Sequence, residues 1–232
     1  MKLAKLLRNE GYDYIEGIVR NHKPLQLWLK EGNDAQLFHV HIGKAFQGSM
    51  VLEEVESPAL NVDFNEKNEY NFNIGITILE NLLTSLGMGA IDFSTKFSKG
   101  KSIAIGFTDT VVKEYTIGDL NNYLVSADLS HPHPELLKQL NRDNILVISG
   151  VIYAKNLRVE METTTSFSAE LKAEIKELVN GKLSMEFKGD KKVVMTSDSL
   201  NYFPIAVKAN CIDFDHGRFM DTRLITDTGN TF

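Results

Sequence analysis

Apolar and polar positions change their spacing twice in one central stretch of the chain. Aromatic and aliphatic residues alternate with asparagines over 70–74, leucines and isoleucines recur at helical spacing over 76–86, and apolar residues alternate again over 91–97. Glu80 is the only charged residue between 70 and 91. The stretch could span a bilayer as one helix, but the changes of spacing predict a strand, an apolar helix and a strand instead.

A second strand–helix–strand pattern follows later in the chain. Apolar residues alternate with charged ones over 157–163, which predicts a strand with one apolar face. Ser168 suits an N-cap, Gly181 suits a helix end, and an apolar helical stripe runs between them. Alternation then resumes over 183–187. Unlike the first helix, this one is rich in charge: Glu170, Lys172, Glu174, Lys176 and Glu177.

The remaining pattern predicts short elements around these two regions. Strands are expected at 12–20, 24–32, 35–43 and 101–109, helices at 2–11, 116–128 and 131–144, and a terminal hairpin at 203–222. Pro134 and Glu135 occupy first-turn positions that favour them, and the hairpin turn is expected at 215–217. Together these elements predict an α+β fold with a twisted, mostly antiparallel central sheet and peripheral helices.

Composition narrows the class of protein. The chain has 232 residues, 43% of them hydrophobic, and no linker rich in proline or glycine, so one domain is expected. A net charge of −6 argues against a nucleic-acid partner, which needs a basic face. Cys211 is the only cysteine, and its apolar strand context predicts a buried, inert thiol. The N-terminus turns polar too early for a signal peptide, which favours a cytoplasmic protein.

Candidate chemistry is sparse. His39 and His41 are two apart in an expected strand and would face the same way, but two imidazoles are too few for zinc. His131 and His133 precede a helix, where capping is the simpler role. The chain contains no nucleophile elbow, phosphate loop or dinucleotide fingerprint. We therefore expect no enzyme, no cofactor and no metal, with a noncontiguous catalytic site including His39 and His41 left as an alternative.

One region resembles a known family. The stretch "IGDLNNYLVSADLSHPHPELLKQLNRDNILVISGVIYAKNLRVEME" combines two leucine-rich helices, an Ala-Asp-Leu step and a long strand pair, and this pattern is similar to the bacterial gasdermins. Order and apolar blocks agree with that family over roughly 1–220. The resemblance implies a gasdermin-like pore-forming domain at 1–220 and a short tail at 221–232, which could be inhibitory.

The resemblance also implies a mechanism. Once released from inhibition, gasdermins oligomerise in a membrane as a large β-barrel pore, in which two strand–helix–strand regions become transmembrane hairpins. The matching regions here are 69–108 and 145–196. The first supplies the hairpin candidates Phe72, Ile74, Ile76, Leu79, Leu82, Leu83, Ile91, Phe93, Phe97, Ile103, Ile105 and Phe107. The second supplies Val151, Tyr153, Leu157, Val159, Met161, Leu183, Met185 and Phe187. Such a pore would act in the inner membrane and cause cell death in anti-phage defence.

Partners and control follow from the same resemblance. Candidates for lipid headgroups are Lys2, Lys5, Arg8, Lys96, Lys99 and Lys101, although these could equally be ordinary surface. An activating protease could cut at Arg218, Asp221 or Arg223. Many bacterial members are palmitoylated on an N-terminal cysteine, but residues 1–20 contain none. The tail could be a minimal plug, another chain could restrain the protein, or the sequence could be a shortened active form. Because alternating strands also occur in soluble antiparallel sheets, a lipid- or partner-binding domain without pore activity stays open.

Overall fold

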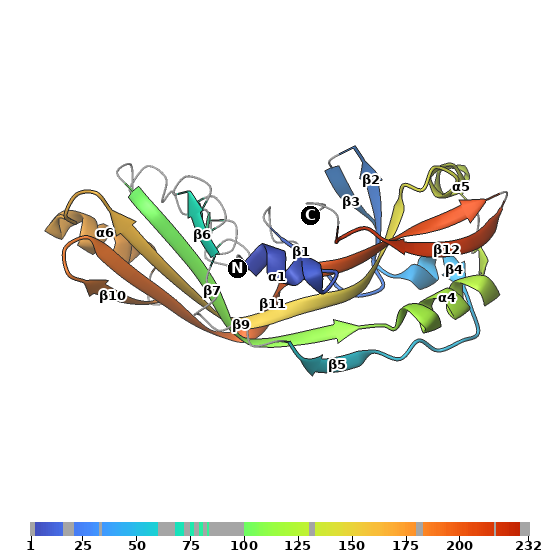
Figure 1. The fold of residues 1–232 in the computed structure, drawn as a ribbon, viewed down its shortest axis with the longest axis horizontal. Helices are drawn as coiled ribbons and strands as arrows, with labels where there is room; N and C mark the ends of the chain where they lie inside the picture. The colour runs from blue at the N-terminus through green and yellow to red at the C-terminus, as the bar shows by residue number, and fades with distance from the viewer. Residues whose placement is uncertain are drawn as a thin grey trace.

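The computed structural model of the protein is an elongated, bent sheet with helices at both ends (Figure 1). The structure describes residues 3–15, 21–32, 34–59, 68–71, 75–76, 79–80, 83, 100–129, 133–179, 183–215 and 217–227.

Three long strands form the spine of the sheet. They are β7 (Gly100–Glu114), β9 (Ile145–Thr163) and β11 (Lys192–Asp215), and they pair side by side in the order β7-β9-β11. Shorter strands extend the edges: β5 (Val55–Pro58) and β6 (Asn68–Asn71) pair with β7; β2 (Leu27–Glu31) pairs with β9 and β3 (Asp34–His39); β1 (Asp13–Tyr14), β10 (Ser184–Lys188) and β12 (Arg218–Leu224) pair with β11. A separate pair joins β4 (Phe46–Gln47) to β8 (Asp128–Leu129). Every pair is antiparallel, so the predicted fold class is confirmed.

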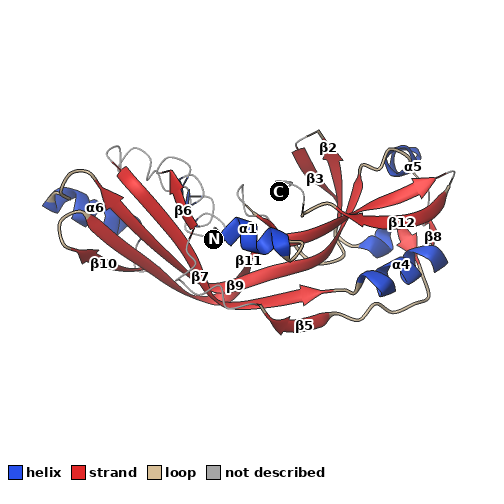
Figure 2. Cartoon of the chain, viewed as in Figure 1, coloured by secondary structure: helices blue, strands red, loops and turns tan. Residues whose placement is uncertain are grey.

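The bend divides the sheet into two parts, which we call the arm and the lobe. The arm contains residues 100–108 of β7, 156–163 of β9 and 192–198 of β11, together with β6, β10 and α6 (Ala169–Val179). The lobe contains the other ends of the long strands with α4 (Ile117–Ser126), α5 (Pro134–Leu140), β2, β3 and β12. Helix α1 (Leu3–Asn9) lies in the concavity between them (Figures 1 and 2).

The helices begin where the sequence predicts. Thr116 caps α4 by accepting a hydrogen bond from the Asp119 amide, and Ser168 does the same for the Leu171 amide of α6. Pro134 opens α5 at the first helical position, where its missing N–H costs nothing. The expected terminal hairpin also forms, with its turn at Gly217, and β10 and β11 form a further hairpin with a turn at Gly189. The φ angles of 84° and 73° at these turns suit glycine.

Two strand predictions were wrong in extent. The strand expected over 12–20 is described only as Asp13–Tyr14, and 16–20 lie outside the described residues. The strand expected over 35–43 ends at His39. His41 instead caps a short 3₁₀ helix, η1 (Ile42–Lys44), by accepting a hydrogen bond from the Gly43 amide. His39 and His41 therefore do not share a strand face, and the paired-histidine hypothesis is wrong because a cap competes with the strand there.

Separate apolar cores fill the two ends of the molecule. Leu120, Tyr123 and Leu124 of α4 pack with Phe46 and Ile145 in the lobe core. The Tyr123 hydroxyl donates to the Phe46 carbonyl at 2.7 Å, so this buried polar group is satisfied. A second core runs from beneath α1 through the arm. The second core concerns the function most directly.

Candidate functional site

One face of the arm is lined mainly by apolar side chains. The side chains that point to it come from all three long strands and are no more than 1% exposed: Ile103, Ile105, Phe107, Leu157, Val159, Met161, Val193 and Met195. The register places them in rows across the sheet, for example Ile105 opposite Val159 and Val159 opposite Met195. Strand alternation alone therefore builds a continuous apolar surface three strands wide.

Helical segments cover that surface. Ile175 of α6 is fully buried, and Phe167 and Leu183 at either end of the α6 segment join the same core. Phe167 packs edge-on against Phe187 of β10, with ring centres 5.4 Å apart. From the first region, Ile76, Leu79 and Leu83 are also buried in this core. The outer face of α6 is exposed and charged, so this helix is amphipathic in the way that a cover between core and water requires.

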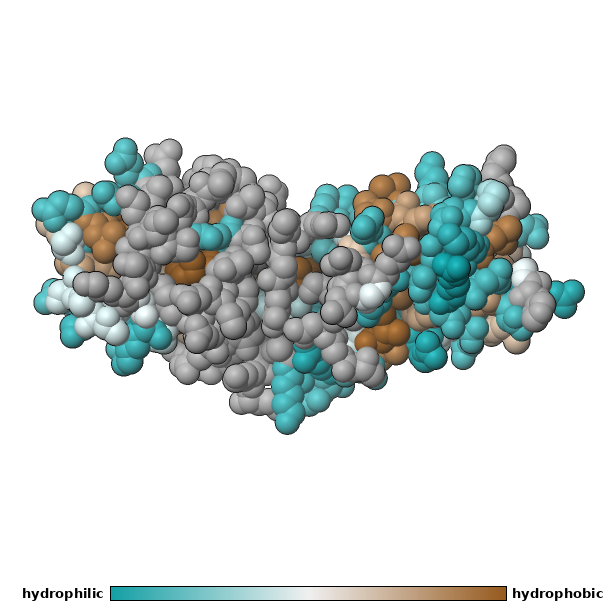
Figure 3. Space-filling model, turned by 90° about the horizontal axis from the view of Figure 1, so that it is seen from above, coloured by the Kyte–Doolittle hydropathy of each residue, from teal (hydrophilic) through white to brown (hydrophobic). Residues whose placement is uncertain are grey.

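The opposite face of the arm carries charged residues in pairs. Lys192 contacts Glu160 at 2.7 Å, Arg158 contacts the same carboxylate at 3.2 Å, and Lys101 contacts Glu162 at 2.8 Å. The hydrogen bond from Lys101 lowers the pKa of Glu162 below its usual value. The arm is thus a sheet with one apolar and one ionic face, and its apolar face packs against α6 and against Ile76, Leu79 and Leu83. In the view of Figure 3, the hydrophobic side chains visible on the described surface form separate patches bordered by hydrophilic residues.

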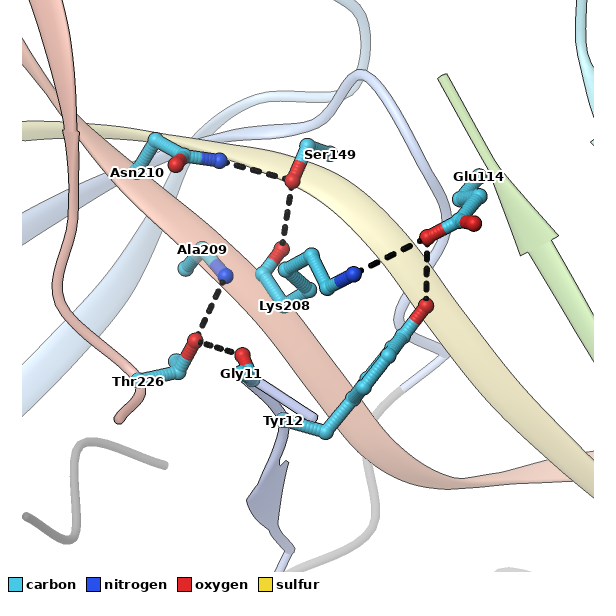
Figure 4. A network of polar contacts seen from close by, with 8 residues as sticks. All are labelled: Gly11, Tyr12, Glu114, Ser149, Lys208, Ala209, Asn210 and Thr226. Carbon is cyan, nitrogen blue, oxygen red and sulfur yellow. Dashed lines mark hydrogen bonds and ion pairs between the residues drawn. The ribbon is translucent and has the colours of Figure 1, made fainter. Parts of the chain in front are cut away.

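A polar junction ties the chain that follows α1 to the lobe side of the bend (Figure 4). The Tyr12 hydroxyl donates to Glu114 of β7 at 2.9 Å, and Lys208 of β11 contacts the same carboxylate oxygen at 3.1 Å. The Lys208 ammonium also lies 4.5 Å from the centre of the Tyr12 ring. Burial, and then the charge of Glu114, raise the pKa of Tyr12 far above its usual value, so the phenol stays a donor. Gly150 makes room, because a Cβ there would lie 2.8 Å from the Tyr12 oxygen.

The end of the described chain closes over this junction. Thr226 is fully buried, and its hydroxyl donates to the Gly11 carbonyl while accepting from the Ala209 amide at 3.1 Å. The Ile225 amide donates to the Ala209 carbonyl, also at 3.1 Å. Residues 225–226, which we call the clasp, therefore join the turn after α1 to β11. Figure 4 shows the clasp beside the contacts of Tyr12.

Comparison with known proteins identifies the family. The family model described as the Bacterial Gasdermin Family matches residues 15–221, which is most of the chain. The chain belongs to the bacterial gasdermin family. Gasdermin bGSDM from Vitiosangium sp. is 25% identical over 166 residues, and this match spans 66% of the present chain but only 60% of the relative, less than two thirds of its length. Gasdermin bGSDM from a Desulfuromonadales bacterium is 20% identical, with 92% and 82% of the two chains covered.

A solved structure agrees with the fold. The structure of a bacterial gasdermin from Bradyrhizobium tropiciagri superposes with a TM-score of 0.63 at 17% identity, covering 96% of this chain and 90% of that one. The gasdermin family is a pore-forming family, which makes the amphipathic arm of this member its candidate functional site.

In this gasdermin the described hairpin candidates come together in the core that runs from beneath α1 through the arm, and only Val151 and Tyr153 of this set lie outside the arm itself. Val151 and Tyr153 lie on the lobe side of the bend, and the Tyr153 hydroxyl donates to the His22 carbonyl at 3.0 Å. Ile76, Leu79, Leu83, Ile103, Ile105, Phe107, Leu157, Val159, Met161, Leu183, Met185 and Phe187 all belong to the arm core or pack against it. Phe72, Ile74, Leu82, Ile91, Phe93 and Phe97 lie outside the described residues.

The candidate lipid contacts and cleavage positions are dispersed. Lys5 and Lys101 are exposed, whereas Arg8 contacts Asp13 at 3.2 Å, and Lys2, Lys96 and Lys99 lie outside the described residues. Arg218, Asp221 and Arg223 are all exposed but sit inside β12, which continues to Leu224, beyond the boundary expected at 220. A protease would have to open that strand to reach them.

Other chemistry is limited in the part of the chain that the structure describes. No group of three or more His, Cys, Asp or Glu side chains there could hold a metal ion. None of the described helices combines the length and apolar character needed to cross a membrane. The sequence patterns missed Tyr12, Glu114, Lys208 and Thr226, because single polar residues far apart in the chain leave no periodic signal.

Proposed function

We propose that this gasdermin is a pore former that, once released from inhibition, oligomerises in the inner membrane as a large β-barrel and kills the cell in anti-phage defence. Before release it would be cytoplasmic. The observation that carries the proposal is the arm, whose strands already separate apolar from ionic side chains and whose apolar face is covered by helices. A membrane-spanning strand needs the same separation, over about 9–11 residues.

The energetics favour an opening that occurs only at a membrane. Burying one large apolar side chain is worth about 1.5–3 kcal/mol, so exposing all eight of the arm face to water would cost on the order of 10–25 kcal/mol. This cost is comparable to or larger than the whole stability of an ordinary domain, about 5–15 kcal/mol. Lipid removes that cost because acyl chains accept the same surface. Closure into a ring would also pair the strand edges, as a bilayer requires.

The clasp supports a form of inhibition that a protease can remove. Thr226 holds the turn after α1 against β11, so a cut on its N-terminal side separates the clasp from the pore-forming chain. A cut after Arg223 meets this condition, as do cuts after Arg218 or Asp221. All three candidate positions would therefore free α1 from the clasp.

Dye release from anionic liposomes tests the proposal. We would compare the full chain, a chain ending at Arg223 and a full-length Thr226→Val variant, which loses both hydrogen bonds of the Thr226 hydroxyl with little change of shape. Thr222→Val is the matched control, because the Thr222 hydroxyl bonds to Asn121 at 2.6 Å, away from the clasp. Leakage by the shortened chain and partial leakage by Thr226→Val would support the proposal. A folded shortened chain that binds liposomes and releases no dye would contradict it.

One observation favours a second candidate, a lipid- or partner-binding domain without pore activity. A cavity of about 170 Å³ lies beside Tyr12, with Leu7, Pro58, Ala59, Val112 and Ile152 on its apolar side. Liposome binding without leakage, abolished by filling this cavity with Ala59→Phe, would favour the binding role.

A further inference from the structure

The bend between arm and lobe coincides with surplus length in β11. Asp198 pairs with Asn156 and Phe203 with Ala154, so β11 advances five residues (198 to 203) while β9 advances two (156 to 154). Three extra residues of β11 are therefore stored at this level of the sheet, and smaller register shifts follow at 204–206 and 208–209. Bulges of this kind bend and twist a strand.

The neighbouring strand is irregular at the same level. Asp109 of β7, between Thr108 opposite Asn156 and Thr110 opposite Ala154, has a φ of 51°. A left-handed backbone inside a strand is unusual for a residue with a side chain. The Asp109 carboxylate accepts a hydrogen bond from the Asn156 side chain at 2.8 Å, which joins β7 to β9 across the bend.

The edge of the sheet changes partner there as well. On the outer side of β7, β6 pairs with residues 102–105 and β5 with residues 111–114, and the Ala59 amide reaches the Thr110 carbonyl at 3.2 Å. Among the described residues, no strand pairs with 106–109 on that side. β11, β7 and the edge outside β7 are thus irregular along one line, which only β9 crosses as a regular strand.

We propose that this line is a hinge, that the sheet straightens about it when the arm leaves its covering helices, and that Asp109 sets the resting bend. The inference rests on the proposed pore function and adds how the change from the bent resting sheet to the straight sheet is controlled. In the bent state residue 109 is left-handed, whereas in a straight strand it must adopt an extended backbone. A substitution that favours one of these conformations shifts the balance between the two states.

Glycine and valine at position 109 should act in opposite directions. Glycine adopts the left-handed backbone freely and weakens a strand, so Asp109→Gly favours the bend. Valine disfavours a positive φ and favours extended backbone, so Asp109→Val favours the straight sheet. Both variants lose the hydrogen bond to Asn156, so this loss does not contribute to the difference between them. Asp109→Asn tolerates a positive φ and keeps an oxygen for the bond, and serves as the control.

Two readouts test the hinge. In a Cys211→Ala background, spin labels at Glu174 of α6 and Val125 of α4, both exposed, report the distance between the two ends of the full chain in solution. Dye-release rates are measured on chains ending at Arg223. We expect Asp109→Val to add a population with a longer distance between the labels. We also expect it to release dye about tenfold faster than Asp109→Gly, because the free-energy cost of a left-handed backbone at a non-glycine residue sets this ratio. Asp109→Asn should match the parent in both readouts.

The outcomes separate the hinge from the pore function. Equal distances and equal leakage rates in the valine and glycine variants, or shifts in the same direction, would overturn the hinge. If no shortened chain leaks, the proposed function fails, and the distance distributions still decide the hinge. If the valine variant fails to fold, Asp109→Gly is compared with Asp109→Asn. A narrower distance distribution and slower leakage in the glycine variant would support the hinge, and equal distributions and leakage rates in the two variants would overturn it.

Discussion

Tyr12, Glu114 and Lys208 meet at one carboxylate although they are separated by 102 and 94 positions in the chain. Their contact depends on Gly150, which faces the Tyr12 hydroxyl without a side chain. No local pattern marks any of these residues, because nothing in the spacing around Tyr12 states which distant strand it will reach. Single polar residues of this kind could be found only once the strand pairing was known.

Gly150→Ala should destabilise the protein. Its new Cβ would lie 2.8 Å from the Tyr12 oxygen and 3.0 Å from the Glu114 Cβ, so the junction must shift. We expect a loss of about 1–3 kcal/mol in the free energy of unfolding, as in other overpacked sites, measured by urea denaturation. Gly118→Ala is the control: a Cβ there meets nothing within 4 Å, and alanine in α4 should stabilise by up to about 1 kcal/mol. Equal stability of both variants would contradict the packing described at Gly150.

The Cys211 thiol should be protected in the native protein. Burial raises its pKa from 9.0 to about 11, and the thiol donates to the Asp143 carbonyl at 3.0 Å. The unfolded thiol ionises first as the pH rises, so the free energy of unfolding should fall between pH 9 and pH 10, and should fall less in Cys211→Ala. At pH 8, a thiol reagent should react slowly with the folded chain and rapidly in denaturant. Rapid reaction of the folded chain would show that the thiol is accessible.

At the scale of elements, local sequence rules predicted more of the structure than they did at the scale of single residues. Alternation predicted the arm strands over 101–107, 157–163 and 183–187 because one face of each is buried or half-buried, and Ser168 was predicted as the cap at which α6 begins. Prediction failed where two local preferences compete, as at His41, whose ring caps η1 rather than continuing the strand. The ionic pairs of the arm could not be predicted from the sequence either, because Lys192 and Glu160 come into contact only through the register of β9 and β11.

Helix α6 should come loose from the arm when its apolar anchor is shortened. Ile175→Ala removes a fully buried side chain and should cost about 2–5 kcal/mol, whereas Lys176→Ala on the exposed face should change stability by less than about 0.5 kcal/mol. Hydrogen exchange should show lower protection in α6 and β10, with the lobe unchanged. If the loss of protection is uniform over arm and lobe, α6 is an integral part of one cooperative unit and cannot open separately.

At the scale of the whole molecule, the bend and the clasp could not have been predicted. The bend coincides with three surplus residues of β11 that are visible only when β11 is aligned against β9. The clasp depends on Thr226 returning to Gly11, 215 positions earlier in the chain. The clasp thereby holds the turn after α1 in the concavity of the sheet, next to the arm that the proposed function requires to move.

The central claim is that the apolar face of the arm becomes the lipid face of a membrane strand. The most direct test places an environment-sensitive fluorophore, one position at a time, at 157–162 of β9 in a Cys211→Ala chain ending at Arg223, bound to anionic liposomes. We predict that Leu157, Val159 and Met161 positions report hydrocarbon and are quenched by lipid-borne quenchers, while Arg158, Glu160 and Glu162 positions report water. Identical signals at all six positions, or signals unchanged from those in solution, would contradict the account.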